Sequence, residues 1–196
     1  RPSWCLNMMT AKKLNFGNIM GHVTNVTNLS SLASWTADQF DPTLTWEDIA
    51  WIKDRWKGKL ILKGIMDSED AMLAVKAGAD AIIISNHGGR QLDGAPSTIS
   101  VLPEIVDAVN SKVEVHFDGG VRSGQDVLKA LALGADCIHI GRPYVYGLGA
   151  KGQEGVEIAI EIIKKELDLT MAMCGETNIS NVGLHNLHHN PFKIIN

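Results

Sequence analysis

Short apolar runs alternate with segments of helical periodicity between residues 59 and 141. Four of these runs are rich in the β-branched and aliphatic side chains that favour strands. They lie at residues 59–63, 81–85, 113–118 and 137–141. Strands separated by helix-length segments are typical of βαβ units. The pattern therefore predicts an α/β fold with four parallel strands and helices between them.

Helix boundary signals fill the intervals between these strands. Residues 67–77 begin at an acidic cap and end before Gly78, and residues 123–133 begin at Ser123 and end before Gly134. Both glycines are followed by Ala-Asp and then by a strand, and they lie 56 positions apart. Such repetition of βα units favours a barrel over an irregular α+β fold.

Two further helices are predicted at residues 45–56 and 153–173, because each has apolar positions at spacings of three and four. In the first helix we expect the tryptophans to pack rather than to bind a cofactor, since large aromatic side chains dominate contacts between helices and sheets. These are Trp46, Trp51 and Trp56. In the second helix the expected core positions are Val156, Ile160, Ile163 and Leu167.

The composition is that of a globular protein, with 196 residues, 45% of them hydrophobic and 20% charged. The net charge of -4 and the scattered basic residues indicate no nucleic-acid partner. Three widely spaced cysteines, Cys5, Cys137 and Cys174, form no CxxC pair, which favours a reducing compartment and gives no zinc motif. We expect Cys137 to be a small core residue. Apolar runs all stay below the roughly 18 to 20 residues that cross a bilayer.

The strand at residues 81–85 leads into the sequence SNHGGRQLDG, residues 85–94. A guanidinium can bind a carboxylate through two hydrogen bonds, and an imidazole with an ordinary pKa of about 6.5 can accept a hydroxyl proton near neutral pH. The two glycines between these groups allow a tight turn and close approach of a ligand. We therefore interpret His87 as a general base and Arg90 as a carboxylate-binding residue, and Asp93 as a surface residue.

This ten-residue motif resembles that of the FMN-dependent 2-hydroxy-acid oxidase and dehydrogenase family. The resemblance implies oxidation of an (S)-2-hydroxy acid to the 2-oxo acid. In such a reaction Arg90 holds the carboxylate, His87 takes the hydroxyl proton, and the Cα hydrogen leaves to flavin N5 as a hydride. A carbanion route would use the same base differently. Within the family the respiratory L-lactate dehydrogenases are most similar, which implies L-lactate as substrate and a respiratory electron acceptor.

Two glycine-rich turns follow the last two strands, DGGVRSG at residues 118–124 and GRP at residues 141–143. Each brings a glycine and an arginine to the start of a helix, where backbone N–H groups and the helix dipole favour a phosphate. Together they resemble the phosphate clamp after the last two strands of a barrel. The family resemblance implies FMN as the cofactor, and no metal is required.

The same resemblance assigns roles toward FMN. Asp118 would hold a ribityl hydroxyl, and the phosphate would lie on Gly120, Arg122, Gly141 and Arg142. Ser85 would face the flavin, and Lys63 would lie beside the N1 and O2 edge of the ring, where a cation stabilises the reduced form. The other interpretation of Lys63 is a lysine that reaches to solvent at the barrel rim.

Barrels of this family have eight βα units, and four are visible here. We therefore expect the C-terminal half of a (β/α)8 TIM barrel. Residues 1–44 would be a long connection that carries an active-site loop, residues 45–175 the FMN-binding half-barrel, and residues 176–196 a C-terminal tail. The expected partners are a small 2-hydroxy acid, the missing N-terminal half-barrel and, at full length, further copies in a homo-oligomer. The expected location is the cytoplasm, with peripheral contact at the inner face of the plasma membrane as a further hypothesis.

Two other functions stay open at this point. One is a phosphate-binding barrel aldolase or isomerase in which Lys63 forms a Schiff base. The other is an inactive half-barrel that only associates with a partner half. The histidines His185, His188 and His189 could imitate a metal cluster, but they lack carboxylates at useful spacing, so we interpret them as part of a solvated tail.

Overall fold

The computed structural model describes residues 2–11, 16–19, 22–23, 26 and 28–188. The chain divides into two units, residues 1–48 and 49–196. The first unit contains helices α1 (Pro2–Thr10) and α2 (Leu29–Asp38). At the start of α2, Asn28 Oδ1 accepts a hydrogen bond from the Ser31 N–H, and Ser31 Oγ accepts one from the Asn28 N–H. The segment predicted as a long connection therefore contains two helices, and its role as an active-site loop stays a prediction.

The second unit is built on a sheet of four parallel strands in the order β1-β2-β3-β4. The strands are β1 (Ile61–Ile65), β2 (Ala81–Ile84), β3 (Glu114–Phe117) and β4 (Cys137–Ile138). Each is shorter than predicted or shifted by two residues, and the register of β1 against β2 slips between Lys63 and Ile65 around Gly64, whose φ is +98°. The predicted α/β fold of four parallel strands and helices is confirmed.

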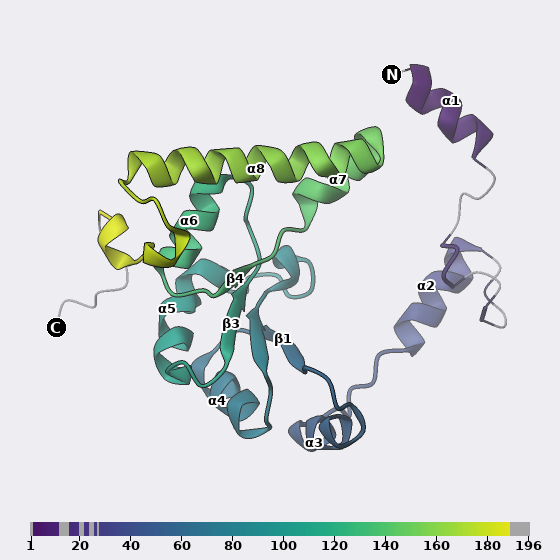
Figure 1. The fold of residues 1–196 in the computed structure, drawn as a ribbon. Coiled ribbons are helices and arrows are strands. Elements are labelled where there is room, and N and C mark those ends of the chain that lie inside the picture. Colours follow the sequence, from purple (N-terminus) through teal and green to yellow (C-terminus); the bar gives the residue numbers. More distant parts are fainter. Residues whose placement is uncertain (1, 12–15, 20–21, 24–25, 27, 189–196) are drawn as a thin grey trace. The chain divides into compact units, whose positions relative to one another are not determined.

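One face of this sheet carries the core. Ile82 and Ile84 of β2 alternate with side chains that point the other way, and Val115 and Phe117 of β3 lie directly beside them in the register. All four are almost fully buried. They are covered by α4 (Ser68–Lys76), α5 (Thr98–Val109) and α6 (Gly124–Ala132). Figure 1 shows these helices along one side of the strands.

The predicted helix caps are present. Asp67 accepts a hydrogen bond from the Asp70 N–H at the start of α4, and Ser123 and Asp126 form a reciprocal capping box at the start of α6. Gly78 and Gly134 follow the helix ends with φ values of +80° and +101°, a conformation that glycine adopts readily.

Helices α7 (Arg142–Lys151) and α8 (Gln153–Met173) pack against each other at glycines. A Cβ atom added to Gly155 would lie 1.9 Å from the Gly147 carbonyl oxygen, so the two backbones touch. The bounds of α8 match the prediction. Of its predicted core positions Ile163 is buried, Val156 and Leu167 are half-buried, and Ile160 is 48% exposed. A helix of 21 residues is about 30 Å long, and it extends past the surface of α6 and α7 that it covers.

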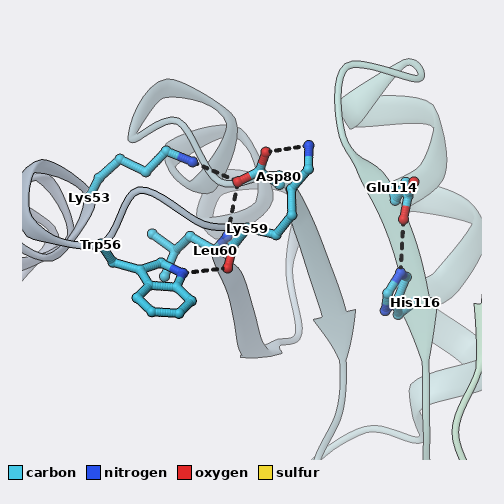
Figure 2. A network of polar contacts seen from close by, with 7 residues as sticks. All are labelled: Lys53, Trp56, Lys59, Leu60, Asp80, Glu114 and His116. Carbon is cyan, nitrogen blue, oxygen red and sulfur yellow. Dashed lines mark hydrogen bonds and ion pairs between the residues drawn. The ribbon is translucent and has the colours of Figure 1, made fainter.

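Helix α3 (Trp46–Arg55) leads to the start of the sheet, where it is tied by charge rather than by burial. Asp80 accepts hydrogen bonds from Lys53 Nζ at 2.6 Å, from Lys59 Nζ at 3.0 Å and from the Leu60 N–H at 2.9 Å (Figure 2). These three donors hold the pKa of the Asp80 carboxyl well below its usual range.

The prediction that the α3 tryptophans pack into the core is wrong for two of them. Trp51 and Trp56 are each 57% exposed. Trp51 lies under the Arg55 guanidinium, and Trp56 donates from Nε1 to the Lys59 carbonyl oxygen at 2.9 Å. Every residue of α3 is exposed or half-buried, because the helix approaches the sheet only at its edge. Cys137, expected in the core, is half-buried. It is the register partner of His116 and therefore lies on the sheet face opposite Val115 and Phe117.

Candidate active site

The carboxyl ends of the four strands open into one pocket with a volume of about 410 Å³. Its walls come from Lys63 of β1, from the turns after β2, β3 and β4, and from the first turn of α7. Eight of the nine residues predicted from the sequence line it, namely Lys63, His87, Arg90, Asp118, Gly120, Arg122, Gly141 and Arg142. The ninth, Ser85, lies just behind the wall and is buried. The parallel topology therefore brings together residues that are up to 79 positions apart.

The turn after β2 is held by Asn86. Its side chain accepts a hydrogen bond from the Gly89 N–H at 3.2 Å and donates one to the Pro96 carbonyl oxygen at 3.1 Å. Within the turn His87, Gly88 and Gly89 have φ values of +55°, +65° and +73°. Positive φ at a non-glycine residue is uncommon and costs free energy, so the turn is a built feature that presents the His87 side chain at the pocket.

Gly88 also allows a long-range contact. Arg142 Nη2 donates a hydrogen bond to the Gly88 carbonyl oxygen at 3.0 Å. A Cβ atom at position 88 would lie 2.7 Å from that same nitrogen, so any larger residue would require the guanidinium to shift. The contact links the turn after β2 to the start of α7 and places the two predicted functions, base and phosphate binding, side by side.

Lys63 is the middle residue of β1, and its side chain reaches across β2 to the end of β3. Its ammonium group donates to Ser85 Oγ at 2.7 Å and forms an ion pair with the Asp118 carboxylate. Ser85 Oγ in turn accepts a hydrogen bond from the His87 N–H at 3.2 Å. Three neighbouring strands are thus joined by one polar chain, which fixes the lysine at the pocket wall with its charge balanced.

The two glycine turns fit a phosphate. A Cβ atom built at Gly120 or at Gly141 meets no described atom within 4 Å, so both backbones have open space beside them in the pocket. Within the described part of the chain no side chain caps the start of α7, which leaves the N–H groups of Arg142 and Tyr144 available, since Pro143 has none. With Arg122 and Arg142 at the same wall, this donor set suits the phosphate of FMN.

His139 is a pocket residue that the sequence reasoning missed. It follows β4, and its ring lies next to His116, with His116 Nδ1 and His139 Nε2 3.1 Å apart. Burial and the neighbouring imidazole lower the pKa of His139. Strand alternation could have predicted part of this arrangement, because Cys137 and His139 are two positions apart and so lie on the same face of the sheet. His116 lies on that face because it is the register partner of Cys137.

Residues 1–189 match the FMN-dependent dehydrogenase family, which is close to the whole chain. The chain belongs to this family. Its relatives include L-lactate dehydrogenase of Vibrio cholerae serotype O1, 43% identical over 187 residues, which cover 95% of this chain and 50% of the relative. L-lactate dehydrogenase of Pseudomonas syringae pv. syringae is 44% identical over 183 residues, which cover 93% of this chain and 48% of the relative.

Solved structures of FMN-dependent dehydrogenase relatives have the same fold. The monotopic membrane protein (S)-mandelate dehydrogenase matches with a TM-score of 0.83 and 36% identity, over 93% of this chain and 48% of that protein. A mandelate oxidase matches with a TM-score of 0.73 and 46% identity, over 79% of this chain and 45% of that protein. The chain therefore spans about half the length of the relatives that it matches, and its fold is a partial (β/α)8 barrel. The helices of the described residues are all too short or too polar to cross a membrane.

Proposed function

We propose that this FMN-dependent dehydrogenase chain supplies the base, the carboxylate-binding residue and the phosphate site of an enzyme that oxidises an (S)-2-hydroxy acid, L-lactate foremost, to the 2-oxo acid. The observation that carries the proposal is the shared pocket. His87 and Arg90 open into the same 410 Å³ space as Arg122 and Arg142, so a substrate and a flavin phosphate site can serve one reaction. The names of the relatives from Vibrio cholerae and Pseudomonas syringae support lactate as the substrate.

Each side chain has a task that its chemistry supports. Arg90 binds the substrate carboxylate through two parallel hydrogen bonds, which fixes the Cα atom in place. His87 accepts the hydroxyl proton as Cα is oxidised, or the Cα proton in a carbanion route. When bound, FMN supplies the two-electron acceptor.

The remaining residues would hold the cofactor. Gly120, Gly141 and the first turn of α7 would contact its phosphate through backbone N–H groups, with Arg122 and Arg142 as the balancing cations. Asp118 would accept a hydrogen bond from the ribityl chain. Lys63, held by Ser85 and Asp118, would place positive charge beside the ring, and its ordered position favours this role over a lysine extended into solvent.

An N-terminal half-barrel is a required partner in this proposal. Four strands leave the sheet with open edges and one uncovered face, which a second set of βα units would bury. The chain alone should bind FMN weakly and should not turn over lactate. Mixing it with an N-terminal half from a matching relative should restore yellow colour and flavin reduction. We call this mixture the reconstituted enzyme, and we expect it to form a homo-oligomer.

We further propose a cytoplasmic location with peripheral contact at the inner face of the plasma membrane. The monotopic membrane character of the (S)-mandelate dehydrogenase relative supports membrane contact. Exposed apolar side chains of residues 1–48, such as Met9, Phe16 and Phe40, would supply it. Co-sedimentation of the reconstituted enzyme with anionic lipid vesicles tests this, and equal recovery in the supernatant with and without vesicles would contradict it.

The defining experiment is anaerobic addition of L-lactate to the reconstituted enzyme. We expect the flavin absorbance to bleach with L-lactate and to stay constant with D-lactate. Arg90 and His87 would fix the carboxylate and the hydroxyl on Cα, so the Cα hydrogen of only one enantiomer would point toward the flavin. The competing aldolase or isomerase function requires a Schiff base on Lys63. Borohydride trapping of a substrate carbon on Lys63 together with an unbleached flavin would replace the proposed function with that one.

A further inference from the structure

Three side chains capable of metal binding meet on the sheet face opposite the helix layer. His116 of β3 is the direct register partner of Cys137 of β4, and His139 lies two residues further on the same side. Their ligand atoms all lie within 4.8 Å of one another. We propose that His116, Cys137 and His139 form a binding site for a divalent zinc-class ion. This proposal is independent of the flavin chemistry.

The two imidazoles already have ligand geometry. His116 Nδ1 and His139 Nε2 are 3.1 Å apart, and the ring planes are tilted by 40°. Two Zn–N bonds of about 2.0 to 2.1 Å at a tetrahedral angle separate their nitrogens by roughly 3.3 Å. The nitrogens, which share a hydrogen bond in the absence of an ion, are therefore separated by nearly the distance that an ion requires. The Cys137 sulfur needs roughly 1 Å of side-chain adjustment to join them, since a Zn–S bond of about 2.3 Å gives S···N separations of roughly 3.6 Å.

Glu114 supplies an independent sign of a metal site. Its Oε2 lies 3.2 Å from His116 Nε2 (Figure 2), whereas His139 lies next to the other ring nitrogen, Nδ1. An ionised carboxylate can only accept a hydrogen bond, so the proton of a neutral His116 is on Nε2 and the lone pair of Nδ1 faces His139 and Cys137. A carboxylate that orients the outer nitrogen of a histidine in this way is the usual support of a histidine ligand to zinc.

The donor set selects the class of ion. Two imidazoles and a thiolate suit Zn²⁺ and its neighbours among the transition metals, whereas Mg²⁺ and Ca²⁺ prefer oxygen ligands. The nearby carboxylates of Glu114 and Asp118 favour a cation at this site. The Lys63 ammonium would repel a cation, but its charge is balanced by the ion pair with Asp118. Three protein ligands leave the fourth position of a tetrahedral ion for water.

The site lies where the sheet is weakest. Strands β3 and β4 are paired through only two residue positions, one of which is His116 with Cys137. An ion bound by both strands would join them just below the pocket that His139 lines. The site was not predicted from the sequence. Cys137 and His139 are two positions apart, but His116 is 21 positions before Cys137, and only the parallel register of β3 and β4 brings it beside them.

Titration of the purified chain with Co²⁺ alone tests the proposal. Cobalt bound by a thiolate has a charge-transfer absorption in the near ultraviolet, which we expect to saturate at one equivalent and to disappear when Zn²⁺ is added. Cys137→Ser should abolish the band. Cys174→Ser, which changes an exposed thiol at the end of α8, should retain it. Absence of the band in the native chain, its persistence in Cys137→Ser or its loss in Cys174→Ser would overturn the proposal.

A second variant keeps the test decisive if Cys137→Ser folds poorly. The Glu114 side chain is 71% exposed, so Glu114→Gln should leave the fold intact. Loss of a carboxylate that supports a histidine ligand typically weakens metal affinity about 10- to 100-fold. We expect that decrease in Co²⁺ affinity for Glu114→Gln and no change for the matched surface variant Glu161→Gln. Equal Co²⁺ affinity in the native chain and in Glu114→Gln would contradict the proposed site.

Discussion

Arg142 Nη2 donates a hydrogen bond to the Gly88 carbonyl oxygen at 3.0 Å, although the two residues are 54 positions apart in the chain. The contact joins the start of α7, where the phosphate would bind, to the turn that presents His87. With the proposed roles, flavin binding and the position of the base would be coupled through one guanidinium.

Replacing Arg142 with glutamine should weaken FMN binding by the reconstituted enzyme roughly 10- to 100-fold. Hydrogen bonds to charged groups contribute about 1.5 to 3 kcal/mol each, and the variant loses both the phosphate contact and the bond to Gly88. Titration of flavin fluorescence quenching measures the affinity. Arg55→Gln, which changes a guanidinium over Trp51 away from the pocket, is the control and should bind FMN normally. Equal affinity in Arg142→Gln would remove this residue from the phosphate site.

Arg90→Lys should weaken binding of an unreactive 2-oxo acid even though the positive charge is kept. An ammonium group cannot reproduce the two parallel donors of a guanidinium, so we expect a decrease of about tenfold or more. Perturbation of the flavin spectrum on titration reports the binding. Flavin affinity should stay constant in the same variant. Unchanged affinity for the 2-oxo acid would mean that another residue holds the carboxylate.

Gly155→Ala should destabilise the protein, because its new methyl group would overlap the Gly147 backbone at 1.9 Å. Overpacking of this kind typically costs about 1 to 3 kcal/mol in the free energy of unfolding. At Gly149 of α7 an added Cβ meets no described atom within 4 Å. Gly149→Ala is therefore the matched control and should be neutral or stabilise by up to about 1 kcal/mol. Urea unfolding distinguishes the two, and equal stability of both variants would show that α7 and α8 do not touch at these glycines.

The free energy of unfolding should decrease at acidic pH because of Asp80. Its folded-state pKa lies below the ordinary value of 3.8 because Lys53, the Leu60 N–H and Lys59 favour the charged form. The unfolded chain then binds the proton more readily, so the stabilisation is complete above pH 3.8 and decreases as the pH falls below that value toward the folded pKa. Urea unfolding at pH 7 and at pH 3 measures it. Asp80→Asn should be less stable than the native protein at pH 7, and the difference should narrow at pH 3.

The exposed pair of Asp54 and Lys57 provides the control for Asp80. Its atoms are 3.6 Å apart and its carboxylate is 81% exposed, so Asp54→Asn should change stability little at either pH. A difference between native protein and Asp80→Asn that is the same at both values of pH would show that the carboxylate charge is not what stabilises this end of the sheet.

The sequence predicted those parts of the fold that have local signals. The caps at Asp67 and Ser123 and the strand at residues 81–85 were recognised because capping residues and β-branched runs act over a few positions. A helix between the second and third strands was expected, but the bounds of α5 were not predicted, and its interior contains Pro103, a residue that usually ends a helix. The exposed side of α8 was missed because periodicity identifies an apolar stripe but not the extent of the surface that covers it.

The candidate site divides in the same way. The motif at residues 85–94 and the two glycine turns placed seven residues at one pocket, and Lys63 of β1 is the eighth, because parallel strands present their carboxyl ends at the same edge. The Arg142 contact with Gly88 and the meeting of His116 with His139 depend on side-chain reach and strand register. Neither contact can be recognised from a pattern of neighbouring residues in the sequence.

The most direct test of the account is the rate of flavin reduction in His87→Ala. In the reconstituted enzyme, mixed anaerobically with L-lactate in a stopped-flow instrument, we expect the variant to retain FMN and to bleach about 10² to 10⁴ times more slowly than the native protein, because it lacks the base that accepts the substrate proton. Bleaching at the native rate with FMN fully bound would contradict the assignment of His87 and with it the proposed reaction at this pocket.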